Sequence, residues 1–458
     1  MGIFSSRKVD MLHGSLWDKL IVFAIPLALT NVLQQLFNTA DVAVLGHYAG
    51  RDAMASVGSM TPVISIFVAV FLGLALGANV VLAQHLGSKS YQRLKDGSGT
   101  TLWLGILLGL AAFSSCYPLT DEILNLVSVP EGIMPQSKIY LQYYSLGLPA
   151  MSIYNFSAAM LRSIGDTTSP LISLGLASIL NIVLNLVFTI CFEWGVFGVA
   201  LATTIANWLS ALILLFVVWR SPVFGLSIHL PFNRQEFIFM LRIGFPAAIQ
   251  GIVFCFSNVI VQSAINTLGE NVIAGSAAAF TIEINMYCLM SAFAQAATTF
   301  VSQNFGARKI ARCIRVTKVT LGMTMSLNIV MSLVIIIIAP NLLAIFTTDP
   351  LVLEMATLRI WYIILPNVVT IFIDLLSGSL RGYGCSLPPA IATLVAVCGV
   401  RIVWVFTVFK MYQEFWVILI SYPLSWLAAA ILIGFVYWRF RRHNLIFKHL
   451  DSHKQLVA

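Results

Sequence analysis

The sequence predicts an all-α integral membrane protein with twelve transmembrane helices in two six-helix, pseudo-symmetric lobes. Three observations support this fold class. The chain of 458 residues is 59% hydrophobic and only 10% charged, whereas a soluble domain averages about 25% charged residues. Its apolar residues gather in long stretches, and the second half of the chain repeats residues of the first half at a nearly constant spacing. An ordinary soluble protein is therefore excluded.

Twelve apolar stretches are long enough to cross a membrane, because a bilayer core of about 30 Å needs about 20 helical residues. The stretches lie near residues 18–45, 54–84, 98–119, 137–162, 169–192, 196–219, 237–266, 273–303, 316–340, 356–380, 388–411 and 415–439. Several are longer than a bilayer requires, which predicts tilted or bent helices. Plausible bends are marked by Pro26, Pro149, Pro246 and Pro366.

The basic residues alternate between the two sides of the predicted membrane. One side holds most of them, in the segments 7–8, 89–95, 220–242, 308–318 and 439–454. The opposite loops hold little beyond Arg51, Lys138, Arg359 and Lys410. Because Lys and Arg accumulate in cytoplasmic loops, we expect a multi-pass protein of the cell membrane with both termini in the cytoplasm.

The two halves of the chain repeat each other. Pro26 recurs as Pro246 and Asn38 as Asn258, both at a spacing of 220, while the segment 161–165 returns as 380–384 at a spacing of 219. Two six-helix halves in the same orientation are a known transporter architecture. We therefore expect an N-lobe over 1–219, a cytoplasmic linker over 220–236, a C-lobe over 237–440 and a cytoplasmic tail over 441–458. The linker is either a hinge or a solvated connection.

A polar stripe runs along the first predicted helix. Asn31, Gln34, Asn38 and Asp41 are three or four residues apart, so they share one helix face. Asn and Gln in such a stripe can simply hydrogen-bond neighbouring helices. A carboxylate in a span costs about 2.5–3.5 kcal/mol on insertion scales, so we expect Asp41 to lie at or near a cation-coupling site of a protein that moves something across the membrane.

Partners for Asp41 are expected on the fifth and sixth predicted helices. Asn181 and Asn185 are one turn apart on the fifth, and Thr203 lies on the sixth. Together with Asn38, their oxygen atoms could hold a hydrated proton or a small hard cation beside Asp41. Packing of the Asn side chains between helices is the alternative interpretation.

The second half has a different set of charges. Val261 stands at the position that matches Asp41, although Asn258 keeps its polar character. The acids are Glu283 and Asp374, and Arg401 lies deep in its span. We expect Arg401 to pair with Asp374 or Glu283, either as a purely structural ion pair or at a cavity for a substrate.

Tyr287 and Met290 follow Glu283 on roughly one face of the eighth predicted helix. Soft thioethers and aromatic rings suit promiscuous apolar binding surfaces, so these two residues and Gln34 join the candidates for a substrate cavity. Packing in the apolar core is the alternative interpretation.

The sequence contains no pattern of an enzyme or of a metal site. We find no P-loop, no HExxH, no GxSxG and no GxGxxG in a credible context, and the seven cysteines are scattered without a CxxC or Cys/His cluster. The net charge of +8 arises in short loops between spans and so does not indicate nucleic acid binding. We expect no enzyme activity, no cofactor, no metal, no ATP and no nucleic acid, and a monomer in the lipid bilayer.

Four segments resemble signatures of the bacterial-type MATE (multidrug and toxic compound extrusion) transporters. They are Gln34-Gln35-Leu36-Phe37-Asn38-Thr39-Ala40-Asp41 leading to Gly46, Phe300-Val301-Ser302-Gln303-Asn304-Phe305-Gly306-Ala307, Ile345-Phe346-Thr347-Thr348-Asp349-Pro350 and Ser377-Gly378-Ser379-Leu380-Arg381-Gly382. The resemblance implies an antiporter coupled to H⁺ or Na⁺ that exports amphipathic, often cationic, drugs and toxic compounds. It also implies two lobes in a V around a central cavity.

The resemblance also implies roles for individual residues, taken position by position. Asp41 matches the acid of the N-lobe in that family, and Asn181 and Thr203 match its polar partners. Asn185 departs from the relatives that have an Asp there, which leaves Asp41 as the only deep acid of the lobe. Glu283 and Asp374 stand where one bacterial branch has acids.

Two other classes compete with the antiporter. A flippase for lipid-linked precursors, from the same superfamily, should have a strongly cationic cavity for pyrophosphate, and among the deep residues the sequence suggests only Arg401. A membrane enzyme or scaffold would need a catalytic cluster that the sequence does not contain. Transport against a pH or Na⁺ gradient in proteoliposomes would separate the three.

Overall fold

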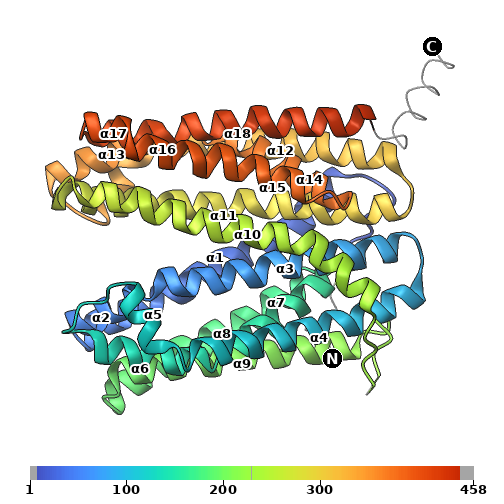
Figure 1. Cartoon of the computed structure of the whole chain (residues 1–458), viewed down its shortest axis with the longest axis horizontal. Helices are drawn as coiled ribbons and strands as arrows, with labels where there is room; N and C mark the ends of the chain where they lie inside the picture. Colours follow the sequence, from blue (N-terminus) through green and yellow to red (C-terminus); the bar gives the residue numbers. More distant parts are fainter. Residues whose placement is uncertain (1–7, 228, 444–458) are drawn as a thin grey trace. The chain divides into compact units, whose positions relative to one another are not determined.

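The polypeptide folds almost entirely into long helices (Figure 1). The computed structural model describes residues 8–227 and 229–443, and no strand occurs among them; the side chain of Asn38 also lies outside the described part. Helices are expected here because a segment in hydrocarbon must pair every backbone N–H and C=O internally. The predicted all-α membrane fold class is confirmed.

Two compact units divide the described chain. Unit 1 comprises residues 25–248 with residues 8–10, and unit 2 comprises residues 249–443 with residues 11–24. The border between the units falls inside two helices, α1 (Trp17–Tyr48) and α10 (Arg234–Asn266), within two residues of Pro26 and of Pro246. The two repeated halves thus divide their first long helix within about one helical turn of the same place.

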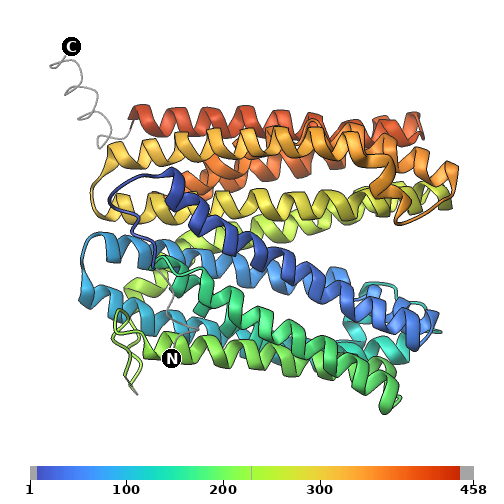
Figure 2. The ribbon, with the colours of Figure 1, turned by 180° about the vertical axis from the view of Figure 1, so that it is seen from behind.

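Unit 1 is built around α7, which packs against α3, α4 and α9, while α8 lies along α9. Figure 2 shows the chain from behind, with the short non-helical segment before α1 leading into that helix. Besides its parts of α1 and α10, the unit contains α2 (Arg51–Gly58), α3 (Thr61–Gly87), α4 (Tyr91–Cys116), α5 (Thr120–Leu126), α6 (Met134–Ser145), α7 (Leu148–Ser163), α8 (Thr168–Leu186), the π-helical turn η1 (Val187–Cys191) and α9 (Gly195–Arg220).

Unit 2 is built around α11, which packs against α12, α13 and α14, while α18 covers α13, α14 and the π-helical turn η2. Besides its parts of α1 and α10, the unit contains α11 (Glu270–Gly306), α12 (Ile310–Ala344), α13 (Pro350–Ile364), α14 (Val368–Gly382), α15 (Leu387–Thr393), η2 (Leu394–Gly399), α16 (Val400–Phe406), α17 (Val408–Met411) and α18 (Phe415–His443).

The described helices give ten spans by length and composition, or eleven when the bent pair α13–α14 is counted as one. These two helices meet at 46° around Pro366, where the sequence predicts a bend. The remaining predicted span, 137–162, is divided, because α6 ends at Ser145 and α7 begins at Leu148, next to Pro149. Proline lacks the N–H that would continue the helix. The predicted limits of lobes and linker stay predictions, and residues 444–458 of the predicted tail lie outside the described part.

Candidate functional site

Asp41 lies at the centre of a buried polar network in unit 1. Its side chain is 2% exposed. Nδ2 of Asn185 on α8 donates a hydrogen bond of 2.7 Å to Oδ1 of Asp41, and Oγ1 of Thr203 on α9 donates one of 2.7 Å to Oδ2. Both carboxylate oxygens are therefore held by neutral groups. Within the described residues, no basic side chain forms an ion pair with Asp41.

Asn181 completes this network. It lies one turn before Asn185 on α8, which places both side chains on the face that meets α1 and α9. Nδ2 of Asn181 donates to Oγ1 of Thr203 at 3.1 Å, and Nδ2 of Asn185 donates to Oδ1 of Asn181 at 3.2 Å. The π-helical turn η1 begins two residues after Asn185, and such turns are frequent at functional sites. The four side chains form one connected, almost fully buried group.

The arrangement can accept a small cation. The Oδ1 atom of Asn185 is buried and has no hydrogen-bond partner among the described residues, so an unused acceptor remains next to the Asp41 carboxylate. Oxygen atoms of carboxylate, amide and hydroxyl groups suit a proton or a small hard cation. The sequence places Asp41, Asn181, Asn185 and Thr203 together, and the structure does so too, although their role stays a prediction.

Two further candidates on α1 do not add to this geometry. The side chain of Asn38 lies outside the described part of the structure. Gln34 is partly exposed and makes no hydrogen bond to a described residue.

Glu283 forms a two-point ion pair with Arg359 in unit 2. Nε of Arg359 donates to Oε1 of Glu283 at 2.8 Å, and Nη2 donates to Oε2 at 2.9 Å. Nη1 of the same guanidinium donates to Oγ of Ser276 at 2.6 Å. Arg359 is 2% exposed, so it is a buried partner of Glu283. Its expected place in a loop is therefore wrong.

Asp374 has a different arginine beside it. Arg381 lies two turns further along α14, near enough for its charge to act on the Asp374 carboxylate, and Tyr287 of α11 lies beside the same carboxylate. Nη2 of Arg381 also donates to Oε1 of Gln250 on α10 at 2.6 Å. Tyr287 is 41% exposed, so this cluster borders on a surface of unit 2. The expected role of Asp374 and Tyr287 in binding a substrate stays a prediction.

The expected pairing of Arg401 with Asp374 or Glu283 is wrong. Nε of Arg401 donates to Oγ of Ser425 at 3.1 Å, and Nη1 donates to Oδ1 of Asn258 at 3.2 Å. Glu283 instead pairs with Arg359 on α13, and the charge of Arg381 on α14 acts on Asp374. The guanidinium of Arg401 instead lies 4.3 Å from the ring centroid of Tyr422.

Met290 belongs to the apolar core. It is 5% exposed and packs with Ala297, Ile371 and Leu375, which agrees with the alternative interpretation made from the sequence.

Arg359 and Arg381 are the residues that sequence reasoning missed. Arg359 lies near the start of the apolar stretch 356–380, and Arg381 directly follows its end and stands in one of the recognised segments. An arginine within a span needs an internal partner, and this signal could have pointed to both.

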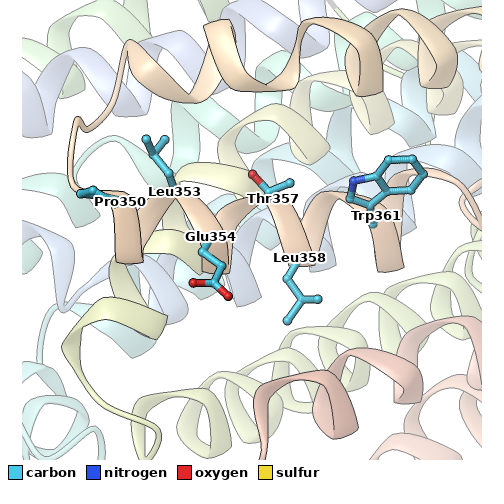
Figure 3. Close-up of a pocket in the computed structure, with 6 residues that line it drawn as sticks. All are labelled: Pro350, Leu353, Glu354, Thr357, Leu358 and Trp361. Atoms are coloured by element: carbon cyan, nitrogen blue, oxygen red, sulfur yellow. The ribbon is translucent and has the colours of Figure 1, made fainter.

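Figure 3 shows a hollow along one face of α13 that contains none of the candidates. Its lining residues all come from this helix: Pro350, Leu353, Glu354, Thr357, Leu358 and Trp361. Their spacing places them on one face, whereas Arg359 on the same helix is buried. A hollow made by a single helix is a shallow surface feature, so we do not regard it as the functional site.

Comparison with known proteins supports the repeat and the fold. The family model MatE matches residues 26–187 and again residues 246–407. The chain belongs to the MatE family. It is therefore a membrane transporter and not an enzyme. The two matched segments start 220 residues apart, which is the spacing of the internal repeat.

Individual relatives cover nearly the whole MatE chain. It is 30% identical over 405 residues to "Probable multidrug resistance protein NorM" of Thermotoga maritima, covering 86% of both proteins. It is 23% identical to "Multidrug export protein MepA" of Staphylococcus aureus, covering 90% of this chain and 92% of that protein. The crystal structure of MATE in the bent conformation superposes with a TM-score of 0.88 at 21% identity, covering 98% of this chain and 99% of that one. This last similarity confirms the two-lobe fold.

Proposed function

We propose that this transporter is an antiporter, coupled to H⁺ or Na⁺, that exports amphipathic and often cationic compounds from the cytoplasm. Asp41 takes the coupling cation, and Asn181, Asn185 and Thr203 orient its carboxylate. Family membership supports the transport class. The drug-related names of its relatives support the class of cargo.

The observation that carries this proposal is the neutral surrounding of Asp41. A carboxylate that is 2% exposed and hydrogen-bonded only by Asn185 and Thr203 has no counter-charge among the described residues. A buried charge of this kind is costly, and a bound proton or Na⁺ neutralises it. Occupancy of the site therefore changes the relative free energies of the transporter's conformations and shifts their populations. Such a shift is what coupling to an ion gradient requires.

The test is dye transport by proteoliposomes under an imposed pH or Na⁺ gradient. Asp41→Asn should insert in the membrane at the normal level but lose gradient-driven transport, because an amide cannot exchange a proton or bind a cation strongly. The matched control is Asp52→Asn in α2, an exposed acid that has no place in the network, and it should transport as the wild type does. Wild-type rates from Asp41→Asn would refute the assignment.

The charges of unit 2 favour an antiporter over a flippase for lipid-linked precursors. Arg359, Arg381 and Arg401 all lie inside unit 2, but Glu283 and Asp374 balance two of these three charges. A pyrophosphate group carries several negative charges and calls for a cavity with a larger positive excess. Export of a dye without transfer of lipid-linked pyrophosphate is the outcome that we expect.

We further infer that both termini face the cytoplasm and that the transporter works in the cell membrane as a monomer. The accumulation of basic residues in alternate loops supports this orientation. Without a P-loop in its sequence, the chain would use an ion gradient rather than ATP, and no bound cofactor.

A further inference from the structure

The residues around Arg401 in unit 2 repeat the positions of the Asp41 network in unit 1. Asn258 and Val261 follow Asn38 and Asp41 by 220 residues. In both units, a π-helical turn interrupts a helix that contributes to this group of residues. The turn is η1, after α8, in unit 1 and η2, before α16, in unit 2. The same part of the fold therefore holds a carboxylate in one unit and a guanidinium in the other.

The other partners of the two groups also correspond. Tyr422 follows Thr203 by 219 residues, and each lies against its charged group: Thr203 donates to Asp41, and the Tyr422 ring lies under Arg401. Arg401 itself belongs to the stretch 388–411, which repeats the stretch 169–192. The repeat has therefore kept the place of the site and reversed the sign of its charge.

Arg401 has no counter-charge among the described residues. It is 1% exposed, and its hydrogen-bond partners, Asn258 and Ser425, are neutral. The nearby Arg359, whose guanidinium lies 5.7 Å from the Tyr422 ring centroid, is already neutralised by Glu283. This buried group of side chains thus carries one positive charge in excess, which is costly within a membrane-spanning region.

Several donors around Arg401 are still free to bind an anion. A guanidinium has five N–H donors, and two of those of Arg401 are used by Ser425 and Asn258. Asn258 accepts through Oδ1, which leaves its amide N–H groups as further donors next to Arg401. The rings of Tyr422, Phe254 and Trp426 lie 4.3, 5.7 and 5.9 Å from the guanidinium carbon. Aromatic rings stabilise the guanidinium cation but accept few hydrogen bonds, so the other N–H donors of Arg401 remain available.

We propose that Arg401, with the amide of Asn258, binds a small monovalent anion in unit 2, at the place where unit 1 holds Asp41. The anion is either chloride from solution or a carboxylate group on the cargo. The chloride source is independent of the proposed export function, whereas the carboxylate source rests on it. Charge-assisted hydrogen bonds from a guanidinium suit both anions.

The first experiment measures the melting temperature of the purified full-length protein in detergent by its tryptophan fluorescence. Sodium chloride replaces sodium isethionate, a bulkier anion without a carboxylate, stepwise at constant pH and ionic strength. For the wild type, we expect a saturable rise in melting temperature with chloride. Arg401→Gln should shift the chloride midpoint upward by about tenfold or more, because it removes a charged donor. The control Arg220→Gln, an exposed arginine at the end of α9, should keep the wild-type midpoint.

The second experiment tests the cargo as the source of the anion. Binding of rhodamine B, which has a free carboxylate, is compared in isethionate buffer with binding of its ethyl ester, which lacks it. If the cargo supplies the anion, the wild type binds the acid about tenfold more tightly than the ester, and Arg401→Gln binds both equally.

The two experiments separate the possible outcomes. A chloride response alone identifies a dissolved anion, and a carboxylate preference alone identifies the cargo. A wild type that shows neither response overturns the proposal, whatever the variants do. If Arg401→Gln does not fold, Asn258→Ala keeps the guanidinium but removes the amide donor and the Oδ1 acceptor of Arg401, and it must weaken whichever response the wild type shows.

Discussion

At the scale of single residues, the neighbour of each acid decides what that acid can do. Asp41 is held by the neutral groups of Asn185 and Thr203, so its charge is open to a proton or a cation. Glu283 is neutralised by the two-point pair with Arg359, which suits a structural role. Asp374 lies between these extremes, because Arg381 acts on it near a partly exposed surface.

The effects of Glu283 and Arg359 on the stability of unit 2 should depend on each other. Removing one partner of a buried ion pair typically costs about 3–5 kcal/mol, because the other charge stays buried. We expect Glu283→Gln and Arg359→Gln each to lower the melting temperature markedly, and the double variant to lower it less than the two single effects added. Thermal unfolding in detergent measures this, and additive losses would show that the two side chains do not depend on each other.

The Asp374–Arg381 pair should sort cargo by charge. Asp374→Asn leaves Arg381 unopposed, so export of a cationic dye should fall by about three- to tenfold relative to a neutral dye. Arg381→Gln leaves Asp374 unopposed and should shift the same ratio the other way. Efflux rates of one cationic and one neutral dye at matched expression measure the ratio. If both variants move it in the same direction, the pair acts through stability and not through charge.

The sequence predicts the unit 1 site better than the unit 2 site for a physical reason. Asp41, Asn181 and Asn185 are polar residues in apolar stretches whose nearest partners are also polar, so the pattern itself indicates the network. Arg359 and Arg381 lie close to the ends of their stretches, where an arginine could equally well reach the membrane surface. Their partners are fixed by tertiary packing, which spacing along the chain does not reveal.

At the scale of helices, α14 depends on close contact with α11. Gly378 of α14 has no room for a larger side chain, because a Cβ there would lie 2.7 Å from Oγ1 of Thr298 and 2.9 Å from the carbonyl oxygen of Ala294. These two helices also carry Asp374 and Tyr287, so the spacing of the helices sets the distance between these two side chains.

Gly378→Ala should therefore push α14 away from α11. We expect a loss of about 1–3 kcal/mol in stability from overpacking, together with slower dye export. Gly322→Ala in α12 is the matched control, because a Cβ there meets nothing within 4 Å, and it should be neutral or slightly stabilising. Thermal unfolding and efflux of both variants measure the effect, and equal behaviour of the two would contradict the packing argument.

The helices could be predicted from apolar stretches, and two of their interruptions from prolines, but the π-helical turns could not. Pro366 marks a real bend, since α13 and α14 meet there at 46°. The break between α6 and α7 also follows from a proline, but its extent depends on local packing. The π-helical turns η1 and η2 have no proline or glycine pattern that distinguishes them from an α-helix, so nothing in the sequence indicates them.

At the scale of the whole molecule, the proposed orientation in the membrane can be tested at the loop before α4 and the loop after α5. Ser88 lies in the exposed basic loop between α3 and α4, and Glu131 lies in the exposed loop between α5 and α6. The first loop belongs to the side that collects Lys and Arg, so it should face the cytoplasm.

Cysteine labelling in intact cells decides this orientation. The experiment uses a Cys191→Ser background, because Cys191 is exposed and would react by itself. In that background, Glu131→Cys should react with a membrane-impermeant maleimide added outside, whereas Ser88→Cys should react only after the membrane is opened. The apolar span between the two loops excludes a charged reagent from the far side. Labelling of Ser88→Cys in sealed cells would invert the topology, and Asp41 would then have to couple transport in the opposite direction.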